Sequence, residues 1–334
     1  MVWIYFAICV LLILFAGRRV AIYGNIIAER TGLGGAWIGV VLIAVVTSLP
    51  ELFTGISSVT LVGAPDLTIG NLLGANTFNL FNLALLDIFN RNGTILTAKR
   101  SRGYYLTALY SLIMVSFVTA AIGVSRYFSP GIGWIGWYTP IIIILYLYFA
   151  RAIFRAERSV MTQMEQKRPF DEEKAPLRSV YLNFGVSAVV IIGAGVWLAI
   201  IGDQMAEVTG LGQGFVGSIF LAFTTTLPEI TVSFTALRIG AIDLAVANMI
   251  GSNLFNMLII AIDDLLFVDG PILTSVSWLH MVTASAVILM TIVFMVALRF
   301  RPRRYFRLSW WNCTLILLLL ARLYYSGVIV GAST

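Results

Sequence analysis

Two short motifs place a carboxylate and a proline inside stretches that are otherwise apolar. Residues 47–51 are TSLPE and residues 225–229 are TTLPE, and the first follows the run AWIGVVLIAVV. Ser-x-x-Glu is the spacing of a helix capping box, and proline suits the first turn of a helix. Each motif therefore predicts a helix that stops and restarts. Because a carboxylate within a membrane is costly and marks a functional site by default, Glu51 and Glu229 are candidate cation ligands.

The residue types around the two acids favour a hard cation. Thr47, Ser48, Thr225 and Thr226 supply oxygen atoms, and a break in a helix frees backbone carbonyl groups that must face protein or a cavity. Oxygen ligands without His or Cys suit Ca²⁺, Mg²⁺ or Na⁺ rather than zinc or copper. Two carboxylates balance the charge of one divalent ion.

A second pair of motifs adds amide oxygens. GANTFNLFN at 74–82 puts an asparagine at every third position, along one face of a helix, and GSNLFN at 251–256 is its counterpart. Isolated asparagines within a membrane favour hydrogen bonds between helices, but beside an acidic site their oxygens become plausible ligands. The candidate ligands in these motifs are Asn76, Asn79, Ser252, Asn253 and Asn256.

The elements that position these motifs are predicted to be membrane spans. Of the 334 residues, 59% are hydrophobic and only 11% are charged, more apolar surface than a soluble domain can hide. A span needs about 20 apolar residues. The run at the N-terminus lacks a basic n-region and predicts a first span rather than a cleaved signal. Ten segments qualify as spans: 2–26, 33–62, 66–89, 103–123, 132–156, 178–206, 212–239, 242–267, 272–298 and 308–328.

The Lys and Arg residues predict the orientation. With the N-terminus outside, 20 of the 22 fall on the side reached after odd-numbered spans. Since Lys and Arg favour the cytoplasmic side, we expect both termini outside and the polar segment 155–177 inside, in the plasma membrane or cell inner membrane. The net charge of +6 follows mostly from this bias and indicates no nucleic-acid partner.

The two halves of the chain repeat each other. TGLGGAWIG at 31–39 matches TGLGQGFVG at 209–217 and TSLPE matches TTLPE, both at an offset of 178, while residues 71–87 match 248–264 at an offset of 177. Five spans per half is an odd number, so the copies have opposite orientations, as in many secondary transporters. We predict an all-α polytopic membrane protein with a 5+5 inverted repeat and with helices 2 and 7 broken near mid-membrane. The repeats are 1–154 and 178–334, joined by a cytoplasmic linker, 155–177.

These paired motifs resemble the two alpha-repeats of the cation/calcium exchanger superfamily, the sodium/calcium exchangers and their relatives. The resemblance covers essentially the whole chain and implies alternating access, with extracellular Na⁺ or H⁺ exchanged for intracellular Ca²⁺. It implies that Glu51 and Glu229 are the central calcium-binding acids, and that Thr47 and Thr225 coordinate through their backbone carbonyl groups. The hydroxyls of the family's flanking sodium sites are resembled by Ser48, Thr226 and Ser252. The family's central amide or acid positions are resembled by Asn79 and Asn256.

Three positions depart from the family pattern. Ala75 stands where the family often has Ser, Thr226 where Ser is common, and Asn256 where some members have Asp. One flanking site therefore lacks a hydroxyl, and the centre has only two acids. We predict a secondary active antiporter that exchanges Ca²⁺ for Na⁺, with no prosthetic group and no obligate protein partner. An H⁺-coupled antiporter of Ca²⁺ or of another divalent ion such as Mg²⁺ is the alternative, and a cation channel is a remote one.

An enzyme is not expected. The chain has no H-E-x-x-H motif, no phosphate-cradling Gly-rich loop, and only one histidine, His280, for a Ser–His arrangement. The matched acids Asp87 and Asp264 lie at the ends of spans, and we expect helix-end or vestibule roles for them.

Overall fold

A computed structural model describes residues 2–33, 35–91, 93–96, 101–162, 176–208, 221–300 and 308–325. Three sequence features fall outside these ranges: the repeat TGLGQGFVG at 209–217 with the start of the seventh predicted span, most of the predicted linker at 163–175, and the end of the last predicted span.

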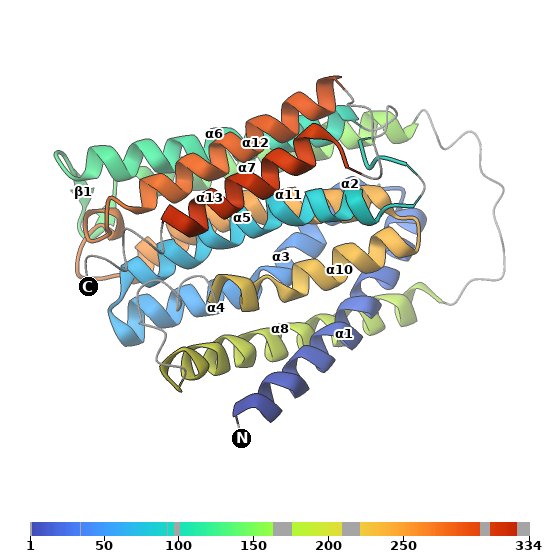
Figure 1. The fold of residues 1–334 in the computed structure, drawn as a ribbon, viewed down its shortest axis with the longest axis horizontal. Coiled ribbons are helices and arrows are strands. Elements are labelled where there is room, and N and C mark those ends of the chain that lie inside the picture. Colours follow the sequence, from blue (N-terminus) through green and yellow to red (C-terminus); the bar gives the residue numbers. More distant parts are fainter. Residues whose placement is uncertain are drawn as a thin grey trace.

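The described chain is helical almost throughout, with long helices lying side by side along the long axis of the molecule (Figure 1). Among the described residues, eight helical segments are long and apolar enough to cross a membrane. The prediction of an all-helical, multi-pass membrane protein is thereby confirmed. Seven of the eight segments lie in the long helices α1 (Val2–Thr31), α5 (Pro65–Phe89), α6 (Ser101–Ser125), α7 (Tyr138–Thr162), α8 (Leu177–Val208), α11 (Ile242–Leu266) and α12 (His280–Phe300). The eighth is the segment Gly35–Val62, and α13 (Trp310–Tyr325), with 16 residues, is shorter than these.

The segment between α1 and α5 is helical but irregular. It comprises α2 (Gly35–Trp37), a π-helical stretch η1 (Ile38–Ile43), α3 (Ala44–Thr47), α4 (Leu49–Ser57) and a second π-helical stretch η2 (Ser58–Val62). Ser48 leaves helical geometry between α3 and α4, with φ −92° and ψ 8°. Pro50 explains the interruption, because it has no N–H to bond the carbonyl group of Val46 and its ring crowds that group.

The second TLPE motif produces the same local structure. Residues 221–225 are helical, Thr226 forms a turn, and α10 (Leu227–Arg238) begins with Pro228 in its first turn. In both motifs the glutamate lies in the first turn of the restarting helix. The sequence therefore sets the same interruption in both halves of the chain.

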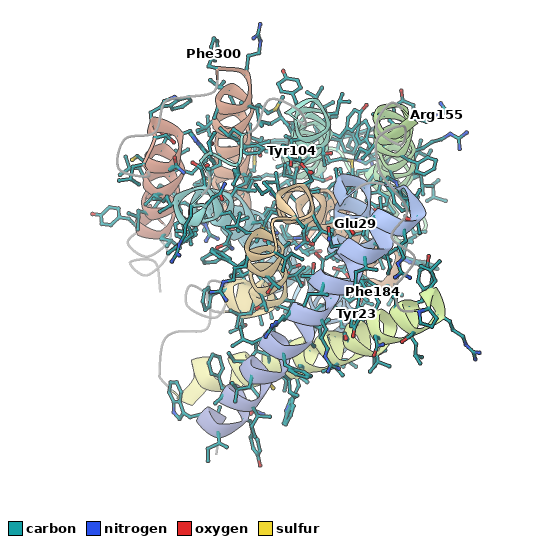
Figure 2. All side chains as sticks on the ribbon, turned by 90° about the vertical axis from the view of Figure 1, so that its right-hand side faces the viewer. Tyr23, Glu29, Tyr104, Arg155, Phe184 and Phe300 are labelled. Carbon is teal, nitrogen blue, oxygen red and sulfur yellow. The ribbon has the colours of Figure 1, made fainter. Side chains whose placement is uncertain are left out.

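Helices α5 and α11 form the centre of the bundle. They contact each other, and 78% of the α5 span and 89% of the α11 span are buried, against 22% of the α7 span. Helices α6, α7, α12 and α13 lie on one side of this pair, and α1 crosses α8 on the other (Figure 1). In the end-on view, Arg155 and Phe300 point away from the bundle while Tyr104 lies within it (Figure 2). The interrupted segments thus lie between the α1–α8 pair and the central helices.

Two predicted spans begin later than expected. Residues 132–136, predicted as the start of the span 132–156, instead belong to an antiparallel hairpin of β1 (Gly131–Ile132) and β2 (Ile135–Gly136), and α7 begins after it. Similarly, α12 begins at His280 rather than at 272, after a 3₁₀ turn η4 (Ile272–Thr274).

Asp264 supplies the physical reason for both differences. Its buried carboxylate accepts hydrogen bonds from the backbone N–H groups of Gly136 (2.8 Å) and Ile272 (2.7 Å), and from the hydroxyls of Tyr138 (2.7 Å) and Thr139 (2.5 Å). These backbone donors are therefore used by a side chain instead of a helix. Asp87 in the first half similarly accepts the N–H of Ile95 (2.7 Å).

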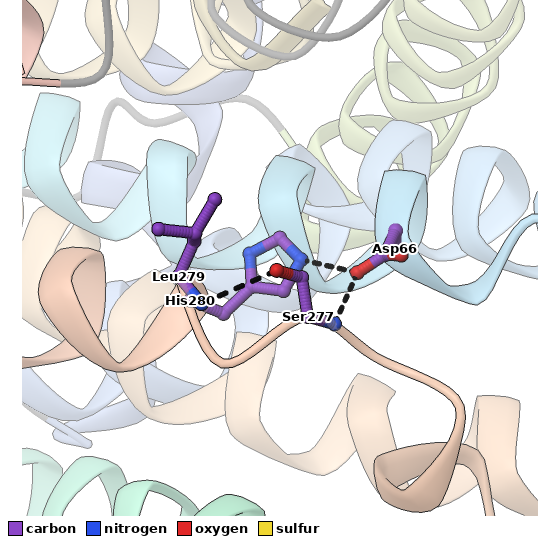
Figure 3. A network of polar contacts seen from close by, with 4 residues as sticks. All are labelled: Asp66, Ser277, Leu279 and His280. Carbon is purple, nitrogen blue, oxygen red and sulfur yellow. Dashed lines mark hydrogen bonds and ion pairs between the residues drawn. The ribbon is translucent and has the colours of Figure 1, made fainter. Parts of the chain in front are cut away.

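A smaller network joins the loop before α12 to the start of α5. Asp66 Oδ1 accepts hydrogen bonds from the backbone N–H of Ser277 (2.6 Å) and from His280 Nε2 (2.8 Å), while Ser277 Oγ accepts the N–H of Leu279 (3.3 Å) (Figure 3). The single histidine of the chain therefore has a contact with one carboxylate at the end of the bundle.

Replacing Asp264 by Asn is expected to destabilise the protein. The amide keeps one acceptor oxygen, so at least one of the buried donors is left unpaired, which costs about 1–3 kcal/mol. The apparent unfolding temperature in detergent measures this, with Asp269→Asn at a nearby exposed acid as control. An equal temperature for both variants would show that Asp264 does not hold these loops.

Candidate cation-binding site

The predicted site residues meet where the two interrupted segments lie against the middle of α5 and α11. Each of the eleven predicted residues is at most 1% exposed. They come from four segments: Thr47, Ser48 and Glu51; Thr225, Thr226 and Glu229; Asn76 and Asn79; Ser252, Asn253 and Asn256. The structure thus brings all of them into the protein interior.

The asparagines of α5 and α11 contact one another reciprocally. Asn76 Nδ2 donates to the carbonyl group of Asn253 (3.4 Å), and Asn253 Nδ2 donates to the carbonyl group of Asn76 (3.3 Å). The amide oxygens of the same two residues accept hydrogen bonds from Asn256 (2.9 Å) and Asn79 (3.1 Å) respectively. Asn76 and Asn253 therefore fix α5 against α11, which is the role that hydrogen-bonding asparagines play between membrane helices.

Two further asparagines hold the interrupted segments and were missed by the sequence reasoning. Thr47 Oγ1 donates to Asn248 Oδ1 (3.3 Å), and Thr225 Oγ1 donates to Asn71 Oδ1 (3.2 Å). Asn248 also donates to the carbonyl group of Glu229 (3.4 Å). The signal was present, because residues 71 and 248 open the matched stretches at an offset of 177.

The two acids are held differently. Glu229 Oε1 accepts hydrogen bonds from the hydroxyls of Ser48 (2.8 Å) and Ser252 (3.4 Å). Thr226, which matches Ser48 in the repeat, instead donates to its own helix, to the carbonyl groups of Ala222 (2.9 Å) and Phe223 (3.0 Å). Such back-bonding is common for Thr in a helix, and it leaves Glu51 without the equivalent donor.

Five acceptor oxygens at the site have no hydrogen-bond donor among the described residues. They are both carboxylate oxygens of Glu51, Oε2 of Glu229, and the amide oxygens of Asn79 and Asn256. A buried acceptor without a partner is costly, and a cation satisfies several such acceptors at once. Carboxylate and amide oxygens suit Ca²⁺ and Na⁺. The described residues contain no cluster of three or more His, Cys, Asp or Glu side chains, so a candidate ligand set here must include amide, hydroxyl or carbonyl oxygens.

Replacing Ser48 by Ala is expected to affect cation binding more than replacing Thr226 by Ala. Ser48 donates to Glu229, whereas Thr226 donates only to its own helix. This bond, worth about 1.5–3 kcal/mol for a charged acceptor, positions the Glu229 carboxylate. Because a misplaced carboxylate binds a cation less well, we expect the apparent cation affinity to fall about tenfold in Ser48→Ala. Titration of cation binding by each variant measures this, and equal effects would contradict the asymmetry.

Helices long and apolar enough to cross a membrane, packed around buried carboxylate, hydroxyl and amide oxygens, are typical of one class of protein, the membrane transporters of cations. The family model for the sodium/calcium exchanger protein matches residues 1–155 and 179–326. The chain therefore belongs to the sodium/calcium exchanger family, which confirms the resemblance found in its motifs and places it among antiporters rather than enzymes.

The chain is also similar to individual proteins over most of its length. The inner membrane protein YrbG of Escherichia coli is 25% identical over 252 residues, 75% of each chain. An uncharacterized membrane protein of Methanocaldococcus jannaschii is also 25% identical over 252 residues, 75% of this chain and 76% of its own length. A solved structure of the sodium-calcium exchanger NCX_Mj, soaked with Na⁺ and Sr²⁺, has a TM-score of 0.71 at 17% identity and covers 97% of this chain and 99% of its own. The fold is shared.

Proposed function

We propose that this protein is a secondary active antiporter that exchanges Ca²⁺ for Na⁺. The observation that carries the proposal is the set of five buried acceptor oxygens without donors, on Glu51, Glu229, Asn79 and Asn256. Two carboxylates match the charge of one Ca²⁺, and the flexible ligand geometry of Ca²⁺ accepts amide and carboxylate oxygens from several helices. The family and the solved exchanger of the same fold support this choice of ions.

We further propose that the site alternates between the two ions. Either Ca²⁺ or Na⁺ neutralises the two glutamates, and the rearrangement that exposes the site to the other side requires this neutralisation, since a bare carboxylate pair is costly in a membrane. The hydroxyls of Ser48 and Ser252, which contact Glu229, would contribute to Na⁺ sites, as would Thr226. The freed carbonyl groups around Thr47 and Thr225 would complete the coordination.

The proposed mechanism uses an inverted repeat. The reciprocal contacts of Asn76 with Asn253, and the matching pairs Thr47–Asn248 and Thr225–Asn71, support two equivalent halves. We propose that the chain has ten spans, divided into the halves 1–154 and 178–334, which the linker 155–177 joins. Helices 2 and 7 would be broken near mid-membrane. The Lys and Arg bias supports termini outside and a cytoplasmic linker, in the plasma membrane or cell inner membrane.

Radiolabelled Ca²⁺ uptake into liposomes containing the purified protein tests the proposal. An outward Na⁺ gradient should drive uptake, and an outward H⁺ gradient at constant Na⁺ should not. Uptake driven by H⁺ alone would replace Na⁺ by H⁺ as the coupling ion. An absence of Ca²⁺ flux under both gradients would overturn the calcium assignment, and Mg²⁺ would then be the divalent ion to test. Flux that no gradient drives uphill would indicate a channel.

A further inference from the structure

Asp263 is a buried acid that the site described above does not use. It lies in α11 with no exposed surface, and neither carboxylate oxygen has a hydrogen-bond partner among the described residues. The contrast with Asp264 is sharp, since that neighbour accepts four hydrogen bonds. A buried ionised carboxylate without a partner is strongly unfavourable, so Asp263 needs a positively charged ligand.

Asp263 lies on the same face of α11 as the residues of the central site, along the seam where α11 contacts α4. At 3.6 residues per turn, Ser252, Asn256 and Asp263 lie within about 40° of one another around α11, and Asp263 is about 10 Å beyond Asn256 along the axis. On the other side of the seam is Gly55 in α4, where an added Cβ would lie 2.3 Å from Asp263 Oδ2. Gly55 follows Glu51 by one helical turn, so both acids face the contact between α4 and α11.

Packing does not require an acid at this position, as the other half of the chain shows. At the repeat offsets, Asp263 corresponds to Leu86, which is fully buried, and Gly55 corresponds to Ser233. Helices α5 and α10, which carry that second pair, also contact each other. One half therefore has a leucine and a serine where the other has a carboxylate and a glycine, and the glycine makes room for the carboxylate.

The chemistry of this position selects a monovalent cation. One carboxylate supplies a single negative charge, whereas Ca²⁺ takes six to eight oxygen ligands, and the close approach of α4 leaves no room for a side chain at position 55. An oxygen atom is available in the same part of α4, since the Thr54 hydroxyl is buried and without a partner among the described residues. The Gly55 carbonyl group beside it accepts the backbone N–H of Ser58 and a long hydrogen bond from Thr68 (3.3 Å).

We propose that Asp263 binds one monovalent cation, Na⁺ or H⁺, between the central site and the end of the bundle where α11 finishes. This rests on the proposed function in one respect, since the proposed orientation makes that end extracellular, the side from which the driving ion enters. The site gives that ion a binding position that the divalent ion does not share.

Counting bound monovalent cations on the purified full chain tests this inference. Saturation binding of radiolabelled Na⁺ without Ca²⁺, and proton uptake between alkaline and mildly acidic pH, are measured for the wild type, Asp263→Asn and Asp263→Leu. We expect each Asp263 variant to bind one cation fewer per chain, in the Na⁺ count if the ligand is Na⁺ and in the proton count if it is H⁺. Asp263→Leu copies the other half of the chain and guards against a folding defect specific to Asn.

The control is Asp269→Asn, the same substitution at an exposed acid nearby, which should match the wild type in both counts. If the Asp263 variants also match the wild type in both counts, the inference is overturned. The test is independent of the proposed function, because it contains no Ca²⁺. The wild type could fail to transport Ca²⁺ while Asp263→Asn still binds one monovalent cation fewer than the wild type. That result would overturn the calcium assignment and keep this site.

Discussion

Replacing Glu51 by Gln abolishes divalent-cation exchange in our account. Both carboxylate oxygens of Glu51 lack donors among the described residues and are fully buried, so they depend on the cation more than those of any other side chain at the site. Gln keeps the size of the side chain and removes the charge. We expect the apparent affinity for the divalent ion to fall about 100-fold or more, which corresponds to about 2.7 kcal/mol or more of binding free energy.

The measurement is radiolabelled Ca²⁺ uptake into liposomes, with the purified variant first shown to unfold at the temperature of the wild type. Glu229→Gln should also lose exchange, because one of its oxygens likewise lacks a donor. Glu29→Gln serves as the control, since Glu29 is exposed and its Oε1 accepts a hydrogen bond from Asn25 (3.0 Å) near the end of α1. Full exchange by Glu51→Gln would remove Glu51 from the site.

The second large effect is expected at Gly251, where α11 passes close to the π-helical stretch η1. An added Cβ would lie 2.6 Å from the Cα and 2.8 Å from the carbonyl oxygen of Val40. Both are backbone atoms, so no side chain can rotate away, and Gly251→Ala forces the two segments apart. Overpacking of this kind costs about 1–3 kcal/mol, and it displaces Ser252, the next residue and a donor to Glu229. We expect a lower unfolding temperature together with impaired exchange.

Gly193→Ala is the matched control for this prediction. Gly193 is an exposed residue within α8, and an added Cβ there would meet nothing within 4 Å. Because Ala favours a helix over Gly by about 1 kcal/mol, this variant should be at least as stable as the wild type. Unfolding temperature and Ca²⁺ uptake of both variants are the readouts. Wild-type stability and transport in Gly251→Ala would show that α11 and η1 do not approach as closely as described.

The sequence predicted the parts of the molecule that depend on local rules. Hydropathy located the long helices, and Pro50 and Pro228 located the interruptions, because proline removes a backbone donor wherever it occurs in a helix. The offsets between the two halves paired Glu51 with Glu229 and matched the asparagine motifs of α5 and α11. All the predicted site residues are buried, as an intramembrane site requires.

The parts that the sequence did not predict depend on contacts between distant residues. Hydropathy predicts helices that include Gly136 and Ile272, but the backbone N–H groups of these residues donate to the carboxylate of Asp264 instead. The matched hydroxyls of Ser48 and Thr226 were treated as equivalent, yet the Thr226 hydroxyl turns back to its own helix. Neither choice is visible in hydropathy or in spacing, since each is a competition between alternative hydrogen-bond partners.

The position of a bound divalent ion tests the central claim most directly. Crystals of the protein soaked with Sr²⁺, a strong anomalous scatterer, would locate the ion independently of any transport assay. We predict one anomalous peak bounded by Glu51, Glu229, Asn79 and Asn256, which disappears when the soak contains Na⁺ in excess. A peak elsewhere in the bundle, or no peak between the two glutamates at saturating Sr²⁺, would contradict the account.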